Sequence, residues 1–206
     1  LDEVITPDNF GMKSAGRVGA APINAVELAD DRGIFVQASG RHLYEITWSP
    51  EKNRYVTYPF SKLTTELFTS GISGLAVRVL PDQRLWVTTR NGDAVCIVFE
   101  PSQQILAAHV PISTSTDTDF FQYFCVLPDN DQDRVYAVVK RVVDATTIYT
   151  WERFARDDEA IVASNCKVMD SHVFGVGAHS TTISLPHLIG REVVAWVDGA
   201  PVTDAA

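Results

Sequence analysis

Short runs of apolar residues, rich in β-branched and aromatic side chains, recur along this chain and are separated by polar turn residues. The clearest example covers residues 85–99, where two runs rich in β-branched and aromatic residues flank Asn91-Gly92. We predict a β-hairpin here, because this dipeptide accepts positive φ at both central positions of a type I′ turn.

The same hairpin pattern occurs three times, with the other copies at residues 32–46 and 134–151. The aromatic residues Phe35, Trp86 and Tyr136 recur at a spacing of about fifty residues, and a Leu-Pro-Asp sequence begins at both Leu80 and Leu127. Repeats of this length with four short strands each are typical of β-propellers.

The pattern therefore predicts an all-β fold. We expect a partial β-propeller of roughly three four-stranded blades, followed by the start of a small separate β module. Residues 1–21 are expected to form an irregular connector, residues 22–154 the three blade repeats, and residues 155–206 the smaller β module or an insertion. The third repeat has no fourth strand of the earlier kind.

The individual elements follow from the same short apolar runs, with the turns at Pro, Gly, Asn and Asp. Predicted strands cover residues 33–37, 41–48, 54–58, 72–80, 85–90, 94–99, 105–110, 121–127, 134–141, 147–151, 181–185 and 192–197, with a weak first strand through Ile23, Ala25 and Leu28 and a turn at Asp198-Gly199. Leu63 and Leu67 lie four residues apart, which predicts a short helix at residues 62–69.

A propeller closes with about 4–8 blades. The chain begins at Leu1, and its pattern shows no clear stop before Ala206. We therefore expect it to be a segment of a longer protein.

The net charge of −9 limits the partners that the chain can bind. A generic nucleic-acid-binding surface needs clustered Lys and Arg, so we expect no such surface, although DNA could still pass nearby. No run of eighteen apolar residues and no secretion signal is present, and we expect no stable membrane insertion. Cys96 and Cys125 lie in apolar strand runs, which predicts buried free thiols in a protein made in a reducing cytoplasm.

Residues 129–133 begin like a calcium-binding loop, with Asp at alternate positions. However, Arg134 stands where the loop requires Gly, and Lys140 where it requires Glu. We predict a solvated acidic turn.

Histidines gather in the last third of the chain, at His172, His179 and His187, with Cys166 nearby. Their spacings of seven and eight match no common pair of zinc ligands, so surface histidines are the default interpretation, and any role of this cluster stays open. Gly175-Val176-Gly177 lacks the third glycine of a dinucleotide-binding loop. We therefore predict no catalytic, cofactor-binding or metal-binding residue, no cofactor and no enzyme activity.

Tryptophan and arginine offer the remaining candidates. The tryptophans could be sugar-stacking platforms, but Trp86 and Trp151 fall in repeated strands, which favours a role in the core between blades. A few arginines could hold blades together by pairing with carboxylates such as Glu100 or Glu152, and the sequence does not assign the pairs. The residues concerned are Trp48, Trp86, Trp151 and Trp196, and Arg78, Arg84, Arg90, Arg134, Arg141 and Arg153.

Several segments resemble one family of virus structural proteins. They are Ile5-Thr6-Pro7-Asp8-Asn9, residues 33–41 with Leu43-Tyr44-Glu45, residues 71–77 with Leu85-Trp86-Val87, residues 148–154 and residues 190–199. Together they are similar to the tail nozzle, or tail tubular B-type, proteins of short-tailed phages and related prophages.

The resemblance implies a propeller-containing subunit of a homohexameric ring that extends the tail tube, conducts genomic DNA without binding it specifically, and docks adaptor and fibre proteins. It implies a place in the virion tail, with assembly in the host bacterial cytoplasm, and no catalytic residue. A glycan-binding β-propeller that recognises the host surface is the alternative. A glycan hydrolase is a third, and it would need two converging carboxylates.

Overall fold

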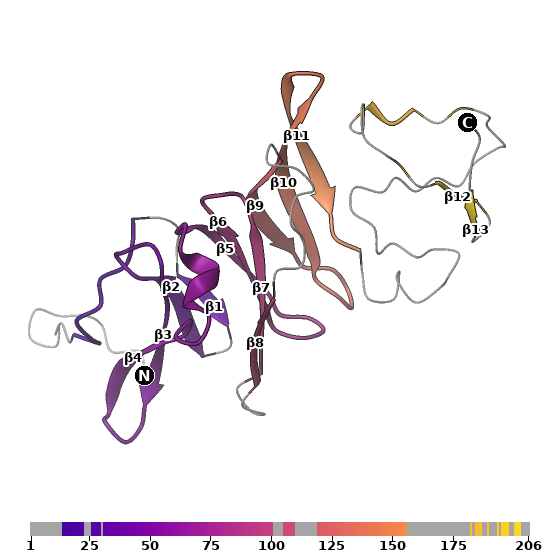
Figure 1. The fold of residues 1–206 in the computed structure, drawn as a ribbon. Coiled ribbons are helices and arrows are strands. Elements are labelled where there is room, and N and C mark those ends of the chain that lie inside the picture. The colour runs from indigo at the N-terminus through magenta and orange to yellow at the C-terminus, as the bar shows by residue number, and fades with distance from the viewer. Residues whose placement is uncertain are drawn as a thin grey trace, which may run out of the picture. The chain divides into compact units, whose positions relative to one another are not determined.

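A computed structural model describes residues 14–22, 26–29, 31–100, 105–109 and 119–155, and, nearer the C-terminus, residues 182, 184–186, 189, 193, 195–197 and 200–202. The described part is all-β, as predicted, with antiparallel sheets of four, four, three and two strands (Figure 1). The chain divides into two compact units, Leu1–Thr69 and Ser70–Ala206.

The first unit contains one four-stranded sheet in sequential order. Its strands are β1 (Glu27–Ala29), β2 (Arg32–Val36), β3 (Leu43–Ser49) and β4 (Arg54–Pro59). Ile34 and Leu43 are fully buried, and the consecutive residues Ile34, Phe35 and Val36 of β2 are all buried, so both faces of this strand are covered. The predicted helix is a single 3-10 turn, η1 (Thr65–Phe68), which buries Phe68.

The last residues of the predicted connector take part in this sheet. Ala20 forms an antiparallel bridge with Gln37, the Ala21 N–H donates to the Val36 carbonyl at 2.8 Å, and the Ala38 N–H donates to the Gly19 carbonyl at 2.7 Å. They occupy the part of the β2 edge that the short strand β1 leaves free, and they satisfy its backbone groups.

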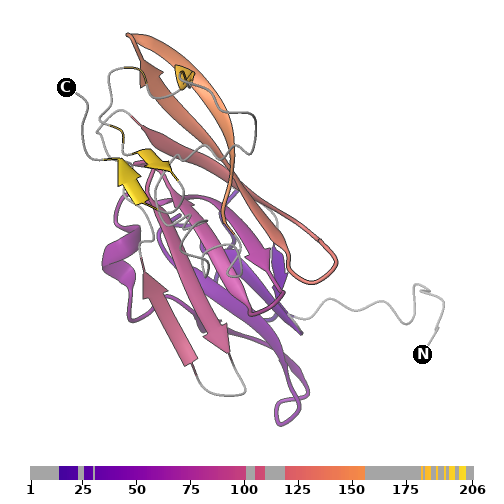
Figure 2. The same cartoon turned by 90° about the vertical axis from the view of Figure 1, so that its right-hand side faces the viewer.

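The second unit contains two larger sheets. Strands β5 (Ile72–Arg78), β6 (Arg84–Thr89), β7 (Ala94–Glu100) and β8 (Ile105–His109) form a second four-stranded meander, and β9 (Phe120–Leu127), β10 (Arg134–Val143) and β11 (Thr146–Arg153) form a third sheet. Strand β9 packs against β5 and β6, so that these two sheets meet face to face (Figure 2). Among the described residues the third sheet has three strands, and the lack of a fourth stays a prediction because residues 156–181 lie outside the described part.

The prediction of a type I′ turn at Asn91-Gly92 is wrong. The Gly92 N–H donates to the Thr89 carbonyl at 3.0 Å, and of the two residues only Gly92 has positive φ, at 90°. This is a type I turn through Arg90 and Asn91, followed by a left-handed glycine. Tertiary contacts fix it, since the Ser70 hydroxyl donates to Asn91 Oδ1 at 2.7 Å and the Phe121 N–H donates to the Gly92 carbonyl at 2.9 Å.

The type I′ geometry occurs instead in the third hairpin. Asp144 and Ala145 have φ of 49° and 58° and connect β10 directly to β11. Two positive φ values match the twist of the flanking strands, and the long regular pairing of these strands follows from that match.

The C-terminal part contains a small antiparallel pair of β12 (Ala195–Val197) and β13 (Ala200–Val202). The turn predicted at Asp198-Gly199 lies outside the described residues. Of the strand predicted at residues 181–185, the described Thr182, Ser184 and Leu185 are not in a strand. The boundary near residue 155 stays a prediction, because residues 156–181 lie outside the described part.

Candidate functional site

Aromatic side chains fill the interface between the second and third sheets. Trp86 on β6 contacts Phe124 and Phe154, with ring centroids 5.2 and 4.7 Å apart, and Phe121 stacks on Phe124 at 5.5 Å. Such pairs contribute about 0.5–1.5 kcal/mol each beyond the area that they bury. The predicted core role of Trp86 is confirmed, since its side chain is 5% exposed.

A polar cluster borders this aromatic core where β5 ends and β6 begins. The turn at Pro81-Asp82-Gln83 places the Asp82 carboxylate against the Arg78 guanidinium and 2.6 Å from Arg84 Nε. Burial alone would raise the pKa of Asp82, but hydrogen bonds and charge interactions with Arg84 and Arg78 outweigh it and lower the pKa. Asp82 therefore stays ionised between two cations.

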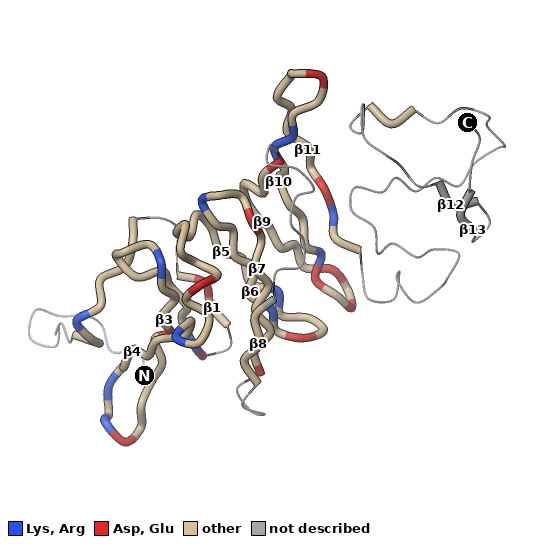
Figure 3. Tube along the Cα trace, in the orientation of Figure 1, with Lys and Arg blue, Asp and Glu red and all other residues tan. Residues whose placement is uncertain are grey.

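The loop between β9 and β10 faces this cluster and carries the predicted acidic turn (Figure 3). Its carboxylates make specific contacts. Asp129 Oδ2 lies 2.8 Å from Arg134 Nε, and Asp133 Oδ2 accepts hydrogen bonds from the Val79 and Leu80 N–H groups, each at 2.9 Å. The turn is thus a clamp that joins the two sheets, and not only a solvated loop.

These groups enclose a cavity of about 80 Å³, which we call the arginine pocket. It is lined by Arg78, Arg84, Trp86, Gln132, Asp133, Arg134, Val135, Phe154 and Ala155. Three buried atoms on its wall, Arg78 Nε, Trp86 Nε1 and Gln132 Oε1, have no hydrogen-bond partner in the protein. Buried polar atoms normally have a partner, so the pocket is suited to hold something polar.

A second buried ion cluster lies within the third sheet. Arg141 on β10 binds Glu152 on β11 through Nε and Nη2, at 2.8 and 2.9 Å, and its Nη1 lies 3.2 Å from Asp119 Oδ2. The expected pairing of an arginine with Glu152 is confirmed. It joins two strands of one sheet, whereas the expectation was a link between blades.

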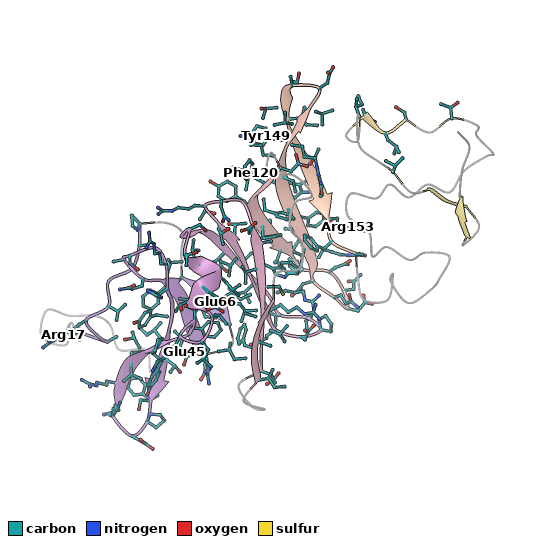
Figure 4. All side chains as sticks on the ribbon, viewed as in Figure 1. Arg17, Glu45, Glu66, Phe120, Tyr149 and Arg153 are labelled. Atoms are coloured by element: carbon teal, nitrogen blue, oxygen red, sulfur yellow. The ribbon has the colours of Figure 1, made fainter. Side chains whose placement is uncertain are left out.

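The face of the third sheet that points away from the second sheet, which we call the outer face, carries large exposed apolar side chains. Trp151 and Tyr149 are 60% and 64% exposed, Tyr123 and Leu127 are also exposed, and the Tyr136 ring stacks on Trp151 at 5.3 Å. Tyr149 is labelled on β11 in Figure 4. The predicted core position of Trp151 is wrong, because the register places it opposite Val138, on the side of β10 away from the second sheet.

An exposed aromatic pair also occurs in the first unit. Trp48 and Tyr55 face each other across β3 and β4 with ring centroids 5.2 Å apart at 75°, and both are about half exposed. With Asn53, Arg54, Ser14 and Ala15 they line a hollow of about 80 Å³, the Trp48 hollow. The hollow has an aromatic surface, with the side-chain amide of Asn53 and the guanidinium of Arg54 beside it.

Two cysteines are described, and they differ from the prediction in one respect. Cys96 is buried against Trp86, and burial raises the pKa of its thiol to about 11, although Arg84 and Arg78 act to lower it. Cys125 is exposed because, unlike Phe124, it points to the outer face.

Other sequence candidates lie outside the described residues. They are Cys166, His172, His179, His187, Gly175-Val176-Gly177 and the side chain of Trp196. Among the residues that the structure describes, no three His, Cys, Asp or Glu side chains come together as ligands for a metal ion. No helix in the described part is long and apolar enough to cross a membrane.

No known protein-family model matches this chain, and no curated protein sequence matches it either. Function must therefore be argued from the sites themselves.

Sequence reasoning missed the arginine pocket, although a repeated signal was present. In each of the three larger sheets the second strand begins with an arginine, and an aspartate of the preceding turn lies beside it. The pairs are Arg32 with Asp31 at 3.9 Å, Arg84 with Asp82 at 2.6 Å and Arg134 with Asp129 at 2.8 Å. Two of these pairs converge on one cavity, and that convergence is not visible in the sequence.

Proposed function

We propose that this chain is a structural segment of a phage tail conduit, a nozzle or tube subunit built from propeller-type blades. The observation that carries the proposal is the repeated plan of the three sheets. Each is an antiparallel meander in which an Asp–Arg pair marks the start of the second strand. A repeated plan of this kind is typical of propeller blades, and three of the five segments similar to tail nozzle proteins lie within these repeats.

The outer face supports the same proposal. The inner face of the third sheet buries Phe121, Ala137 and Val139 against the second sheet, and the outer face carries equally large apolar side chains without cover. Soluble proteins rarely expose contiguous apolar patches of large side chains unless another surface covers them. In the proposed propeller, the next blade packs on the outer face.

This stacking is testable through Cys125. In the 206-residue chain its thiol should react rapidly with a water-soluble maleimide, whereas in the natural full-length protein the next blade should protect it. Equal reaction rates in the two proteins would contradict the stacking. Denatured samples control for the number of reactive thiols.

In the proposed assembly the subunits form a homohexameric ring in the virion tail. This ring docks adaptor and fibre proteins, and the proposal includes no catalytic residue. Genomic DNA passes through the ring without specific binding. The net charge of −9 is consistent with this role, since acidic walls repel a phosphate backbone and let it slide.

The Trp48 hollow favours a second candidate function, glycan binding. Sugar recognition commonly combines an aromatic face with neighbouring polar groups, and Trp48, Tyr55 and Asn53 supply both. A glycan array tests this candidate. Binding that Trp48→Ala abolishes and Trp151→Ala leaves unchanged would establish it, and the absence of any binding would remove it.

A further inference from the structure

We propose that the arginine pocket binds a small oxyanion between the second and third sheets. The ligand is a tetrahedral anion such as phosphate or sulfate, or a carboxylate group. This inference is independent of the proposed function, since it rests only on the lining of the pocket.

The unpartnered atoms on the pocket wall are mostly donors. Trp86 Nε1 and Arg78 Nε can only donate hydrogen bonds, and both side chains are about 5% exposed, so bulk water does not reach them freely. A ligand that satisfies both must offer acceptor atoms close together, as the oxygens of an oxyanion do.

The carboxylates around the pocket are already engaged. Asp82 is held by Arg78 and Arg84, Asp129 lies against Arg134, and Asp133 Oδ2 accepts two backbone hydrogen bonds. A cation would meet three guanidinium groups, and an apolar ligand would leave the buried donors unsatisfied. The charges and donors together therefore favour an anion.

The size of the cavity limits the ligand. A water molecule needs roughly 10–15 Å³ of such a cavity, so about 80 Å³ accommodates an anion with four oxygens. A nucleotide is too large. A bound oxyanion would connect Arg78 and Trp86 of the second sheet with the β9–β10 loop of the third, and would add to the clamp made by Asp133.

The indole N–H signal of Trp86 in a ¹H–¹⁵N NMR spectrum tests the proposal directly, because this N–H is one of the expected donors. The 206-residue chain is titrated with phosphate, with sulfate and with acetate, each against chloride at equal ionic strength, and Trp86→Phe assigns the signal. We expect a saturable shift of this signal with at least one oxyanion and none with adenosine monophosphate. The anion that shifts it distinguishes a tetrahedral ligand from a carboxylate.

Two variants test whether the donors bind the anion. Arg78→Lys keeps the charge but loses Nε, and should weaken binding about tenfold or more, as expected for a charge-assisted hydrogen bond. Gln132→Glu places a carboxylate at the pocket and should abolish the shift. Arg90→Lys, at an exposed turn, and Trp151→Phe, on the outer face, are the matched controls and should bind like the unmodified chain.

The proposal is overturned if no oxyanion gives a saturable shift of the Trp86 signal, since the pocket then holds only water. It is also overturned if the Gln132→Glu variant binds the oxyanion with unchanged affinity. If Arg78→Lys does not fold, the titration of the unmodified chain and of Gln132→Glu still decides the question.

Discussion

Cys96 and Cys125 carry the same thiol in opposite surroundings. Burial raises the pKa of Cys96 to about 11, so at pH 8 only about one part in a thousand is thiolate. Cys125 is exposed on the outer face. The thiolate is the reactive form, so burial lowers the reactivity of Cys96 in two ways, because it shields the thiol and keeps it protonated.

We therefore predict that iodoacetamide at pH 8 modifies Cys125 in the folded chain and leaves Cys96 unmodified until the chain unfolds. Peptide mass spectrometry after timed quenching measures both rates. Modification of Cys96 at the rate of Cys125 under native conditions would contradict the burial described for β7.

Asp82 gives a prediction on pH dependence. The Arg84 and Arg78 contacts lower its pKa in the folded state, so it stabilises the fold above the usual aspartate pKa of about 4, and this stability is lost as the pH falls through the lowered value. Because Asp82 is partly exposed, we expect Asp82→Asn to cost about 1–2 kcal/mol at pH 7, less than a fully buried pair.

Urea unfolding at pH 7 and at pH 3 measures this effect. The destabilisation by Asp82→Asn should shrink at pH 3, where the unmodified carboxyl is losing its charge as well. Asp144→Asn, in the exposed β10–β11 turn, is the control and should have little effect at either pH. If Asp82→Asn lowered the free energy of unfolding equally at both pH values, the ion pairs would not be what stabilises the fold.

At the scale of elements, the β6–β7 hairpin depends on one glycine. Gly92 has a φ of 90°, and a Cβ atom there would lie 2.2 Å from Phe120 Cδ1 and 2.6 Å from Phe120 Cβ. The turn and the first residues of β9 therefore pack against each other, and only glycine fits between them.

Gly92→Ala should destabilise the second unit by about 2 kcal/mol or more, from backbone strain and the clash together. Gly19→Ala is the matched control, since its Cβ would make an ordinary contact with Ala38 at 3.6 Å. Thermal unfolding measures both. A Gly92→Ala chain as stable as the control would contradict this packing.

Most strands could be predicted from the sequence because runs rich in β-branched and aromatic residues, bounded by turn residues, are a local property of the chain. The turn at Asn91-Gly92 could not, because Ser70 and Phe121, distant in sequence, fix its conformation. Trp151 was misplaced for a related reason. Alternation gives the two faces of a strand, but which face is covered depends on what packs against it.

The arginine pocket shows the same limit at the level of a site. The Asp–Arg pairs are local and can be recognised in the repeats, but their convergence requires the packing of β9 against β5 and β6. The donors of Trp86 and Arg78 become significant only once that packing has removed them from water.

At the scale of the whole molecule, the proposed function rests on three sheets of one plan and on the exposed aromatic side chains of the outer face. If the chain is such a conduit segment, its function belongs to surfaces between blades and between subunits. The acidic composition predicts that the channel of such an assembly is negatively charged, because DNA must move through it without binding.

Electron microscopy of the natural full-length protein is the most direct test of the proposed conduit. We expect a six-fold ring with an axial channel, in which these sheets are blades of a propeller and the channel surface is acidic. A monomer without a channel, or a ring with a basic channel, would contradict the proposal.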